Sequence, residues 1–203
     1  MSEGLPLKIA VTGGIGSGKS VVCRVLKAMG YEVFDTDSEA RRIMDSDRGI
    51  HERLTAEIDP LAVVGGRVDR GRISEVVFAS APKLEALNAI VHGAVRRELE
   101  AWFTARSGCA TPVFVETAIL YQSGLDRLVD RVWDIQAPED LRVGRVIARN
   151  GLSEAAVRAR IRAQAFAPAR VHPSVTAFAN DGVRPLLPQI EQALKSITQN
   201  SLI

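Results

Sequence analysis

Residues 13–20 read Gly-Gly-Ile-Gly-Ser-Gly-Lys-Ser and fit the pattern G-x-x-x-x-G-K-[S/T]. The glycines of this pattern let successive backbone N–H groups turn inward around a phosphate, and the positive end of a following helix adds to that attraction. The lysine can bridge the β- and γ-phosphates of a nucleotide, and the final hydroxyl can ligate Mg²⁺. This stretch therefore predicts a phosphate-binding loop, the P-loop, and with it the fold of the chain.

The sequence on either side of the loop has the form that this motif requires. Leu7 to Thr12 is a short apolar run, typical of a buried parallel strand, and Ser20 to Met29 has a helical pattern that Gly30 ends. Tyr31 to Phe34 predicts a second strand. The alternative is a Gly-rich turn that matches the pattern by chance, and the strand and helix that flank the loop argue against it.

Further strand signals alternate with helical ones. Val113 to Glu116 and Val132 to Gln136 predict two more strands, and a last strand is expected near Val175 to Phe178. This alternation predicts an α/β fold, namely the parallel sheet of a P-loop NTPase flanked by helices. We expect a single P-loop domain over residues 1–203, whose core takes about residues 5–37, 111–140 and 171–203.

Two helical parts interrupt the core. About residues 38–110 show helical periodicity without a convincing buried strand, and form an insert whose longest helix starts near Pro82. About residues 141–170 form a basic helical lid, in which one helix runs from Pro138 to Arg149 and Ser153 can cap the next. Apolar residues three and four positions apart predict a buried stripe on the long insert helix, made of Leu84, Leu87, Val91, Ala94, Val95 and Trp102.

The composition is typical of a soluble protein without a strong charge bias. Hydrophobic residues make up 46% of the chain, and 26 basic residues nearly balance 24 acidic ones. Glycines interrupt the first apolar run before it could act as a signal sequence or span a bilayer. Cys23 and Cys109 lack the spacing of a zinc site or a disulfide framework. We expect a cytoplasmic protein without nucleic-acid or membrane partners, present as a monomer or a weak homo-oligomer.

Acidic residues follow two of the predicted strands. Asp35 and Asp37 close the second strand, and the carboxyl ends of parallel strands form the ligand crevice of such sheets. Asp37 can therefore accept a proton from an attacking hydroxyl, although either aspartate can instead cap the helix that follows. Glu116 ends the third strand, where it can hold the hydration shell of Mg²⁺ or be a strand-end charge without a metal.

Several stretches taken together resemble the dephospho-coenzyme A kinase family, which phosphorylates the ribose 3′-hydroxyl in the last step of coenzyme A synthesis. The P-loop is general to many kinases, whereas the D-x-D, the histidine and the late Arg/Gln set are much more particular to this family. All the stretches that carry the resemblance, the P-loop included, cover nearly the whole chain and comprise T-G-G-I-G-S-G-K-S at 12–20, D-T-D at 35–37, G-R-V-D-R…V-F from Gly66 to Phe78, H-G at His92, E-T-A-I-L-Y-Q-S-G at 116–124, A-P at 137–138, R-x-x-x-R-x-G-L-S at 145–153, R-I-R-A-Q ending at Gln164 and N-D-G at 180–182.

The resemblance implies a nucleotide core, an insert that binds the acceptor and a mobile lid, with ATP and dephospho-coenzyme A as substrates and Mg²⁺ bound with ATP. It implies three catalytic residues, with Asp37 as general base beside Lys19 and Arg145. The implied ATP-binding residues are Gly14, Ile15, Gly16, Ser17, Gly18, Lys19, Ser20, Val21, Arg145, Arg149 and Asn180. The implied acceptor-binding residues are Asp35, Asp37, Phe78, His92 and Glu116. Ser20 and Glu116 are the implied metal ligands.

Several of these residues also have a structural interpretation. Arg145 and Arg149 lie four apart on one helix face, where they can reach one phosphate or the adenine plane, or can form a solvated face. His92 can serve packing, Phe78 can lie in the core or form a wall for the acceptor, and residues 180–182 can form only a turn. A solvated face is the favoured interpretation of Arg158, Arg160 and Arg162.

The chain departs from the pattern of the family at a few positions. Gly93 replaces the proline that usually follows the histidine, and Gln122 replaces an acidic residue. Glu116 stands where the family often has aspartate, and Arg142 stands where a glutamine is common. These departures affect the roles of individual site residues more than the assignment of the family.

Three other functions are alternatives to this interpretation. A nucleoside monophosphate kinase shares the core, the insert and an Arg-rich lid, and is separated here by Asp37, His92 and the stretch from Gly66 to Phe78. The long insert argues against a shikimate kinase. A non-enzymatic nucleotide switch of the GTPase kind would need a guanine-reading N-K-x-D segment and a D-x-x-G switch, and the sequence has neither in the expected place.

Overall fold

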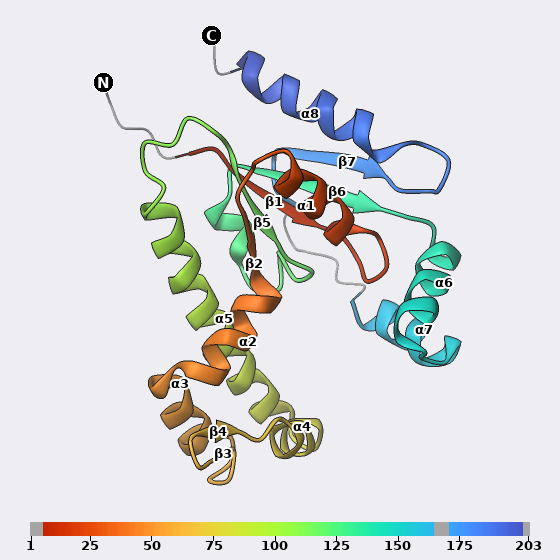
Figure 1. Cartoon of the computed structure of the whole chain (residues 1–203). Helices are drawn as coiled ribbons and strands as arrows, with labels where there is room; N and C mark the ends of the chain where they lie inside the picture. The colour runs from red at the N-terminus through yellow and green to blue at the C-terminus, as the bar shows by residue number, and fades with distance from the viewer. Residues whose placement is uncertain (1–5, 165–170, 201–203) are drawn as a thin grey trace. The chain divides into compact units, whose positions relative to one another are not determined.

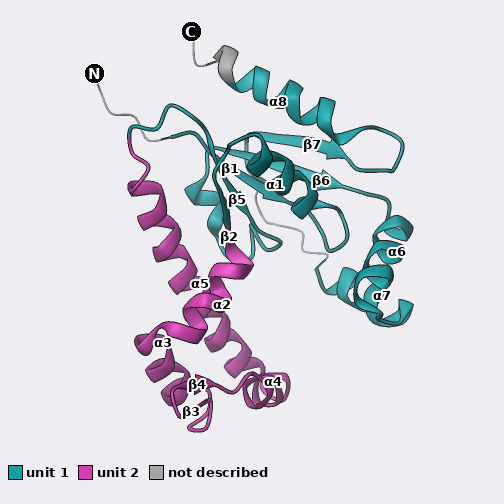
Figure 2. Cartoon of the chain, in the orientation of Figure 1, with its two compact units in different colours: residues 1–34, 108–203 teal, residues 35–107 magenta. Residues whose placement is uncertain are grey.

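The computed structural model describes residues 6–164 and 171–200. The chain divides into two units, which Figure 2 shows in different colours. Unit 1 consists of residues 1–34 and 108–203, and unit 2 consists of residues 35–107. The P-loop lies in unit 1, and Asp35 and Asp37 lie in unit 2.

Unit 1 is built on a five-stranded sheet with the strand order β2-β5-β1-β6-β7 (Figure 1). The central strand β1 (Lys8–Thr12) pairs in parallel with β5 (Val113–Glu116) and with β6 (Arg131–Gln136). β6 pairs in parallel with β7 (Val175–Ala179), and β2 (Val33–Asp35) forms the opposite edge. The predicted α/β fold with a mainly parallel sheet is confirmed.

Helices α1 (Lys19–Ala28) and α8 (Leu186–Asn200) contribute to the core on one face of this sheet (Figure 1). Register pairs Val11 with Trp133, so their side chains share that face. The Trp133 ring lies 5.1 Å from the Phe114 ring and 4.8 Å from the Phe178 ring, measured between centroids. The strands and helices that flank the P-loop are therefore fixed by a continuous apolar core.

Helices α6 (Glu139–Asn150) and α7 (Glu154–Ala163) follow β6 and pack against each other. The Ser153 hydroxyl accepts a hydrogen bond from the Ala156 N–H at 3.3 Å, which confirms the predicted cap of α7. The buried apolar residues that join the two helices are Val143, Val146, Val157 and Ile161. Residues 165–170, which the predicted lid includes, lie outside the described part of the chain.

Unit 2 is mainly helical. It contains α2 (Thr36–Ser46), α3 (Arg48–Arg53), the π-helical turn η1 (Leu54–Ile58), α4 (Arg70–Phe78) and the long α5 (Ala81–Thr104). A short antiparallel hairpin of β3 (Val63–Val64) and β4 (Arg67–Val68), which the sequence did not predict, joins η1 to α4. Its strands are not buried, in agreement with the absence of a buried-strand signal.

The buried stripe of α5 differs in part from the predicted one. Ala94 and Val95 are buried as predicted, but Leu84 is 42% exposed. The predicted and the observed stripe both have helical spacing. Which residues are buried depends on the elements that pack on α5, namely the helices α2, α3 and α4 and the turn η1. The residues buried along α5 are Ile90, Ala94, Val95, Leu99 and Phe103.

Candidate active site

The P-loop connects β1 to α1 through backbone conformations that favour glycine. Gly13, Gly16 and Gly18 have φ values of 141°, 78° and 102°, in the range that other residues rarely adopt. The N–H of Ser17 donates to the Gly14 carbonyl at 3.1 Å, which closes a tight turn inside the loop. The backbone geometry therefore favours glycine at all three positions, and Gly13 and Gly18 are also the glycines of the motif.

Close contacts on the outside of the loop also require glycine. A Cβ atom added to Gly16 would lie 2.6 Å from the Arg142 carbonyl oxygen of α6. One added to Gly13 would collide with the Ile135 carbonyl, and one added to Gly18 would collide with the Asn180 side chain. The loop is thus packed tightly against β6, α6 and the residue after β7.

This packing predicts that Gly16→Ala damages the site more than its backbone strain alone would. A positive φ costs a residue other than glycine about 1–2 kcal/mol, and here the Arg142 backbone must also move. We expect kcat/KM for ATP to fall by roughly 10²-fold, the effect of a misplacement of about 1 Å in a preorganised site. Steady-state kinetics with thermal unfolding as a second measurement check this expectation.

Gly30→Ala is the matched control, because Gly30 has a similar φ of 89° and nothing within 4 Å of an added Cβ. It should lower stability by about 1–2 kcal/mol and leave kcat/KM unchanged. Equal kinetics for the two variants would show that contact with α6 does not matter for the loop.

Lys19 and Ser20 end the P-loop motif and are the first two residues of α1. The Lys19 ammonium donates to the Gly13 carbonyl at 2.7 Å, with the Gly14 carbonyl at 3.4 Å. Ser20 and Val21 are exposed in the first turn of the helix, where N–H groups at a helix start attract anions. The positive charge and the N–H groups that phosphate binding needs are therefore gathered at one end of α1.

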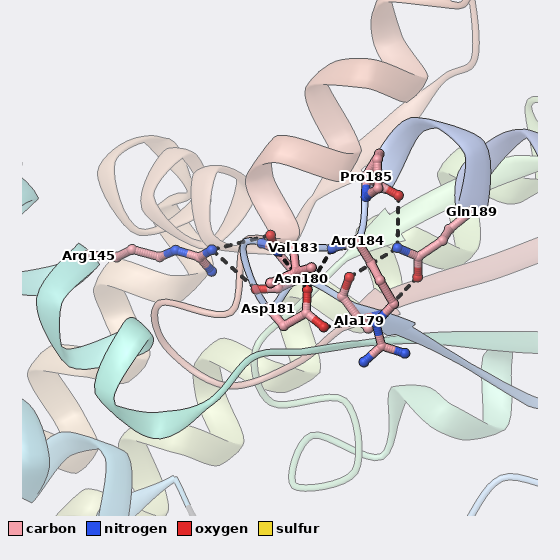
Figure 3. A network of polar contacts seen from close by, with 8 residues as sticks. All are labelled: Arg145, Ala179, Asn180, Asp181, Val183, Arg184, Pro185 and Gln189. Carbon is pink, nitrogen blue, oxygen red and sulfur yellow. Dashed lines mark hydrogen bonds and ion pairs between the residues drawn. The ribbon is translucent and has the colours of Figure 1, made fainter.

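Arg145 and Asn180, two of the predicted ATP-binding residues, both contact the P-loop. Arg145 donates from Nη1 to the Gly16 carbonyl at 3.4 Å. It also donates from Nη2 to the Asn180 carbonyl at 3.1 Å (Figure 3). Asn180 donates from Nδ2 to the Ser17 carbonyl at 2.7 Å. The Arg149 guanidinium is exposed and donates to Asn150 at 2.9 Å, so the structure does not bring it to the loop.

Asn180 is held by a network in the turn that follows β7 (Figure 3). The Gln189 side chain accepts from the Ala179 N–H at 2.9 Å and donates to the Ala179 carbonyl at 3.0 Å. Hydrogen bonds from the backbone of Arg184 and Val183, with the Arg184 guanidinium, hold the pKa of the Asp181 carboxyl well below its usual range. Residues 180–182 do form a turn, and this turn also presents Asn180 to the loop.

Two residues that contact the P-loop were not predicted as site residues. Arg142 donates from Nε to the Ile15 carbonyl at 2.9 Å, and Gln164 accepts from the Ile15 N–H at 2.7 Å. The available signals were the family stretch that ends at Gln164 and the unusual arginine at position 142. Neither signal indicated that the two side chains meet at one loop residue.

The two aspartates of the predicted acceptor site have different roles in unit 2. Asp35 caps α2, since its Oδ1 accepts from the N–H groups of Asp37 at 3.0 Å and Ser38 at 3.2 Å. The Ser38 hydroxyl also donates to Asp35 Oδ2 at 2.7 Å. Asp37 is exposed in the first turn of the helix. The capping alternative therefore describes Asp35, and the Asp37 carboxylate remains the candidate base.

Phe78 and His92, the other two acceptor candidates of unit 2, lie on different helices. Phe78 ends α4 and is 87% exposed, so the prediction that it lies in the core is wrong. The acceptor-wall interpretation therefore stays as the prediction for Phe78. His92 is half-buried on α5, and burial lowers its pKa, so the ring is neutral near pH 7.

The oxygen ligands predicted for Mg²⁺ lie at the carboxyl end of the sheet. Glu116 is the last residue of β5 and pairs in register with Val11, which precedes the P-loop on β1. A carboxylate and the Ser20 hydroxyl are hard oxygen donors that suit Mg²⁺. Residues 6–164 and 171–200 contain no group of three or more His, Cys, Asp or Glu that could hold a metal ion by itself. Phosphate oxygens of the nucleotide would supply the remaining ligands.

Residues 7–185 match the family model described as dephospho-CoA kinase. The chain belongs to the dephospho-CoA kinase family. A dephospho-CoA kinase from Bacteroides fragilis is 32% identical over 195 residues, which cover 96% of this chain and 95% of the relative. One from Thermus thermophilus is 38% identical over 192 residues, which cover 95% of this chain and 90% of the relative.

Two solved structures have a similar fold. The crystal structure of TT1252 from Thermus thermophilus has a TM-score of 0.74 and 36% identity, with 96% of this chain and 97% of that chain covered. Dephospho-CoA kinase from Campylobacter jejuni has a TM-score of 0.61 and 20% identity, with 95% of each chain covered, and shows the same fold.

The family membership confirms that the chain is a kinase, as the sequence predicted. The nucleoside monophosphate kinase and the non-enzymatic switch are not favoured. In the described part of the chain, none of the helices is both long and apolar enough to cross a membrane.

Proposed function

We propose that this chain transfers the γ-phosphoryl group of ATP to the ribose 3′-hydroxyl of dephospho-coenzyme A, giving coenzyme A and ADP. The observation that carries the proposal is a glycine-dependent P-loop, supplied with Lys19 and Arg145, in a chain of the dephospho-CoA kinase family. Dephospho-coenzyme A is the acceptor because the relatives that match over nearly their full length carry this name.

Unit 1 supplies the nucleotide side of the reaction. The N–H groups of the loop and of the first turn of α1 bind the β-phosphate, and Lys19 bridges the β- and γ-phosphates. Ser20 and, through the hydration shell, Glu116 would hold Mg²⁺, and the ion would supply positive charge that neutralises the phosphates of ATP. These chain residues hold the γ-phosphorus in a fixed position for in-line attack.

The residues after β2 supply the acceptor side. The Asp37 carboxylate takes the proton of the attacking 3′-hydroxyl, which raises the nucleophilicity of the oxygen as the new P–O bond forms. Asp35 supports this role by capping α2 and fixing the backbone at Asp37. His92 binds the acceptor as a neutral donor or acceptor of hydrogen bonds, and Phe78 provides an apolar surface for it.

The helices α6 and α7 act as a lid. Arg145 stabilises the negative charge of the transferring phosphoryl group, and Arg149 binds ATP when the lid is closed. A closed lid excludes water and so limits wasteful hydrolysis of ATP. We expect the protein to work in the cytoplasm as a monomer or a weak homo-oligomer, without nucleic-acid or membrane partners.

The test is release of ADP from Mg-ATP by the purified chain, with dephospho-coenzyme A, AMP, CMP and shikimate offered separately. We expect release that depends on dephospho-coenzyme A and coenzyme A as the second product, identified by mass spectrometry. A reaction without an added acceptor measures background hydrolysis. If ADP were released only with AMP or CMP, the chain would be a P-loop kinase with a different acceptor. If no acceptor caused release of ADP, the proposal would be rejected.

A further inference from the structure

Each carbonyl oxygen of the P-loop from residue 13 to residue 17 accepts a hydrogen bond. The Lys19 ammonium donates to the carbonyls of Gly13 and Gly14, and the Ser17 N–H also donates to the Gly14 carbonyl. The remaining three accept from side chains outside the loop: Ile15 from Arg142 at 2.9 Å, Gly16 from Arg145 at 3.4 Å and Ser17 from Asn180 at 2.7 Å.

This arrangement has a direct electrostatic consequence. A peptide carbonyl and its N–H point in opposite directions, so a loop that aims its N–H groups at an anion must turn its carbonyl oxygens away from it. Buried carbonyls without donors are costly, and donors placed outside the loop remove this cost. The outer donors therefore favour the loop conformation that binds phosphate.

Both backbone groups of Ile15 are hydrogen-bonded to side chains from outside the loop. Arg142, from α6, donates to its carbonyl, and Gln164, at the end of α7, accepts from its N–H at 2.7 Å. These two contacts fix the peptide groups before and after Ile15, which lead into the positive φ of Gly16. Rotation of either peptide group would break one of the two hydrogen bonds.

The space for these contacts comes from the glycines next to Ile15. A Cβ atom on Gly14 would collide with the Arg142 guanidinium, and one on Gly16 would meet the Arg142 backbone. Arg142 is half-buried there, so its donor faces the loop in a partly desolvated setting where hydrogen bonds are stronger than in water.

We propose that Arg142 and Gln164 are positioning residues, which preform the P-loop for the phosphates of ATP by holding the Ile15 peptide groups from outside. They act through the loop, in contrast to Lys19 and Arg145, which the proposed function places on the phosphates. The inference rests on the proposed function for its nucleotide, and on nothing that concerns the acceptor.

The decisive variant is Gln164→Met, because it keeps the length of the side chain, removes the acceptor for the Ile15 N–H and changes no charge. We expect the dissociation constant for ATP, measured by calorimetry, to rise by about threefold to tenfold, as the loss of one hydrogen bond implies. KM for ATP should rise by the same factor, whereas kcat at saturating ATP should stay within about twofold, because loop order affects binding of ATP before chemistry.

Arg142→Met should weaken ATP binding by about tenfold or more, because its hydrogen bond comes from a charged donor. Arg142→Lys retains charge and a donor within reach of the Ile15 carbonyl, and should recover part of the loss. Arg160→Met is the matched control, since Arg160 is an exposed arginine of the same helical pair, and it should bind ATP as the wild type does.

The ¹⁵N–¹H resonance of Ile15 distinguishes the loss of this hydrogen bond from a general loss of lid stability. In Gln164→Met it should shift, while amide resonances of α8 stay in place. Unchanged ATP affinity in Gln164→Met, an equal loss in Arg160→Met, or a fall in kcat without a change in KM would each overturn the proposal. Because ATP binding is measured without an acceptor, failure of the acceptor assignment would leave this test intact.

Discussion

Asp37→Asn is expected to slow phosphoryl transfer to dephospho-coenzyme A by roughly two to four orders of magnitude, because the amide cannot accept the proton of the attacking hydroxyl. ATP binding should be retained, since the loop and Lys19 are unchanged. The helix start is also preserved, because Asp35 and not Asp37 caps α2. Single-turnover kinetics with saturating substrates measure the transfer step, and calorimetry measures the affinity for ATP.

Asp45→Asn is the matched control for this variant. Asp45 lies on the same helix, is exposed and forms an ion pair with Arg70 at 2.8 Å, a surface contact whose loss changes stability by about 0–1 kcal/mol. The transfer rate of this control should equal that of the wild type. If Asp37→Asn retained full activity, Asp37 would not be the general base and the proton would have to leave by another route.

Lys19→Met is expected to reduce kcat/KM by roughly 10²–10³-fold or more, because it removes a positioned cation from the charge that develops on the transferring phosphoryl group. The same variant should also bind ATP more weakly, which separates it from Asp37→Asn. The Lys19 ammonium lies 2.7 Å from the Gly13 carbonyl, so the variant also loses a contact that shapes the loop. Steady-state kinetics and calorimetry with ATP check both effects.

Lys27→Met provides the comparison for Lys19→Met on the same helix. Lys27 is exposed in the last turn of α1, where a cation interacts with the helix dipole by about 0.3–1 kcal/mol. We expect slightly lower thermal stability and unchanged kinetics. Wild-type activity in Lys19→Met would exclude the proposed role of the P-loop lysine, whatever acceptor the enzyme uses.

Much of the nucleotide half of the site could be predicted from the sequence. The positions of Lys19 and Ser20 follow from their places in a local motif whose flanking strand and helix are also local signals. Arg145 and Asn180 were expected from the resemblance, and the structure places both against the loop. The capping role of Asp35 was one of two alternatives, and only the hydrogen bonds of α2 decide between them.

Other features depend on contacts between residues far apart in the sequence. The buried stripe of α5 is chosen by the helices that pack on it, so periodicity alone allowed Leu84 to be placed in the core. The exposure of Phe78 likewise depends on which neighbours cover the end of α4. A single sequence carries no direct signal for such partners.

The sequence by itself determined the P-loop, the α/β class and the kinase family, because these depend on local spacing, on strand and helix periodicity and on motifs along the chain. The tertiary structure alone decided that Arg142 and Gln164 hold Ile15 from two sides. The three residues come from three segments, which meet only when α6 and α7 dock beside the P-loop. Contacts of this kind depend on the packing of distant elements, which local propensity does not encode.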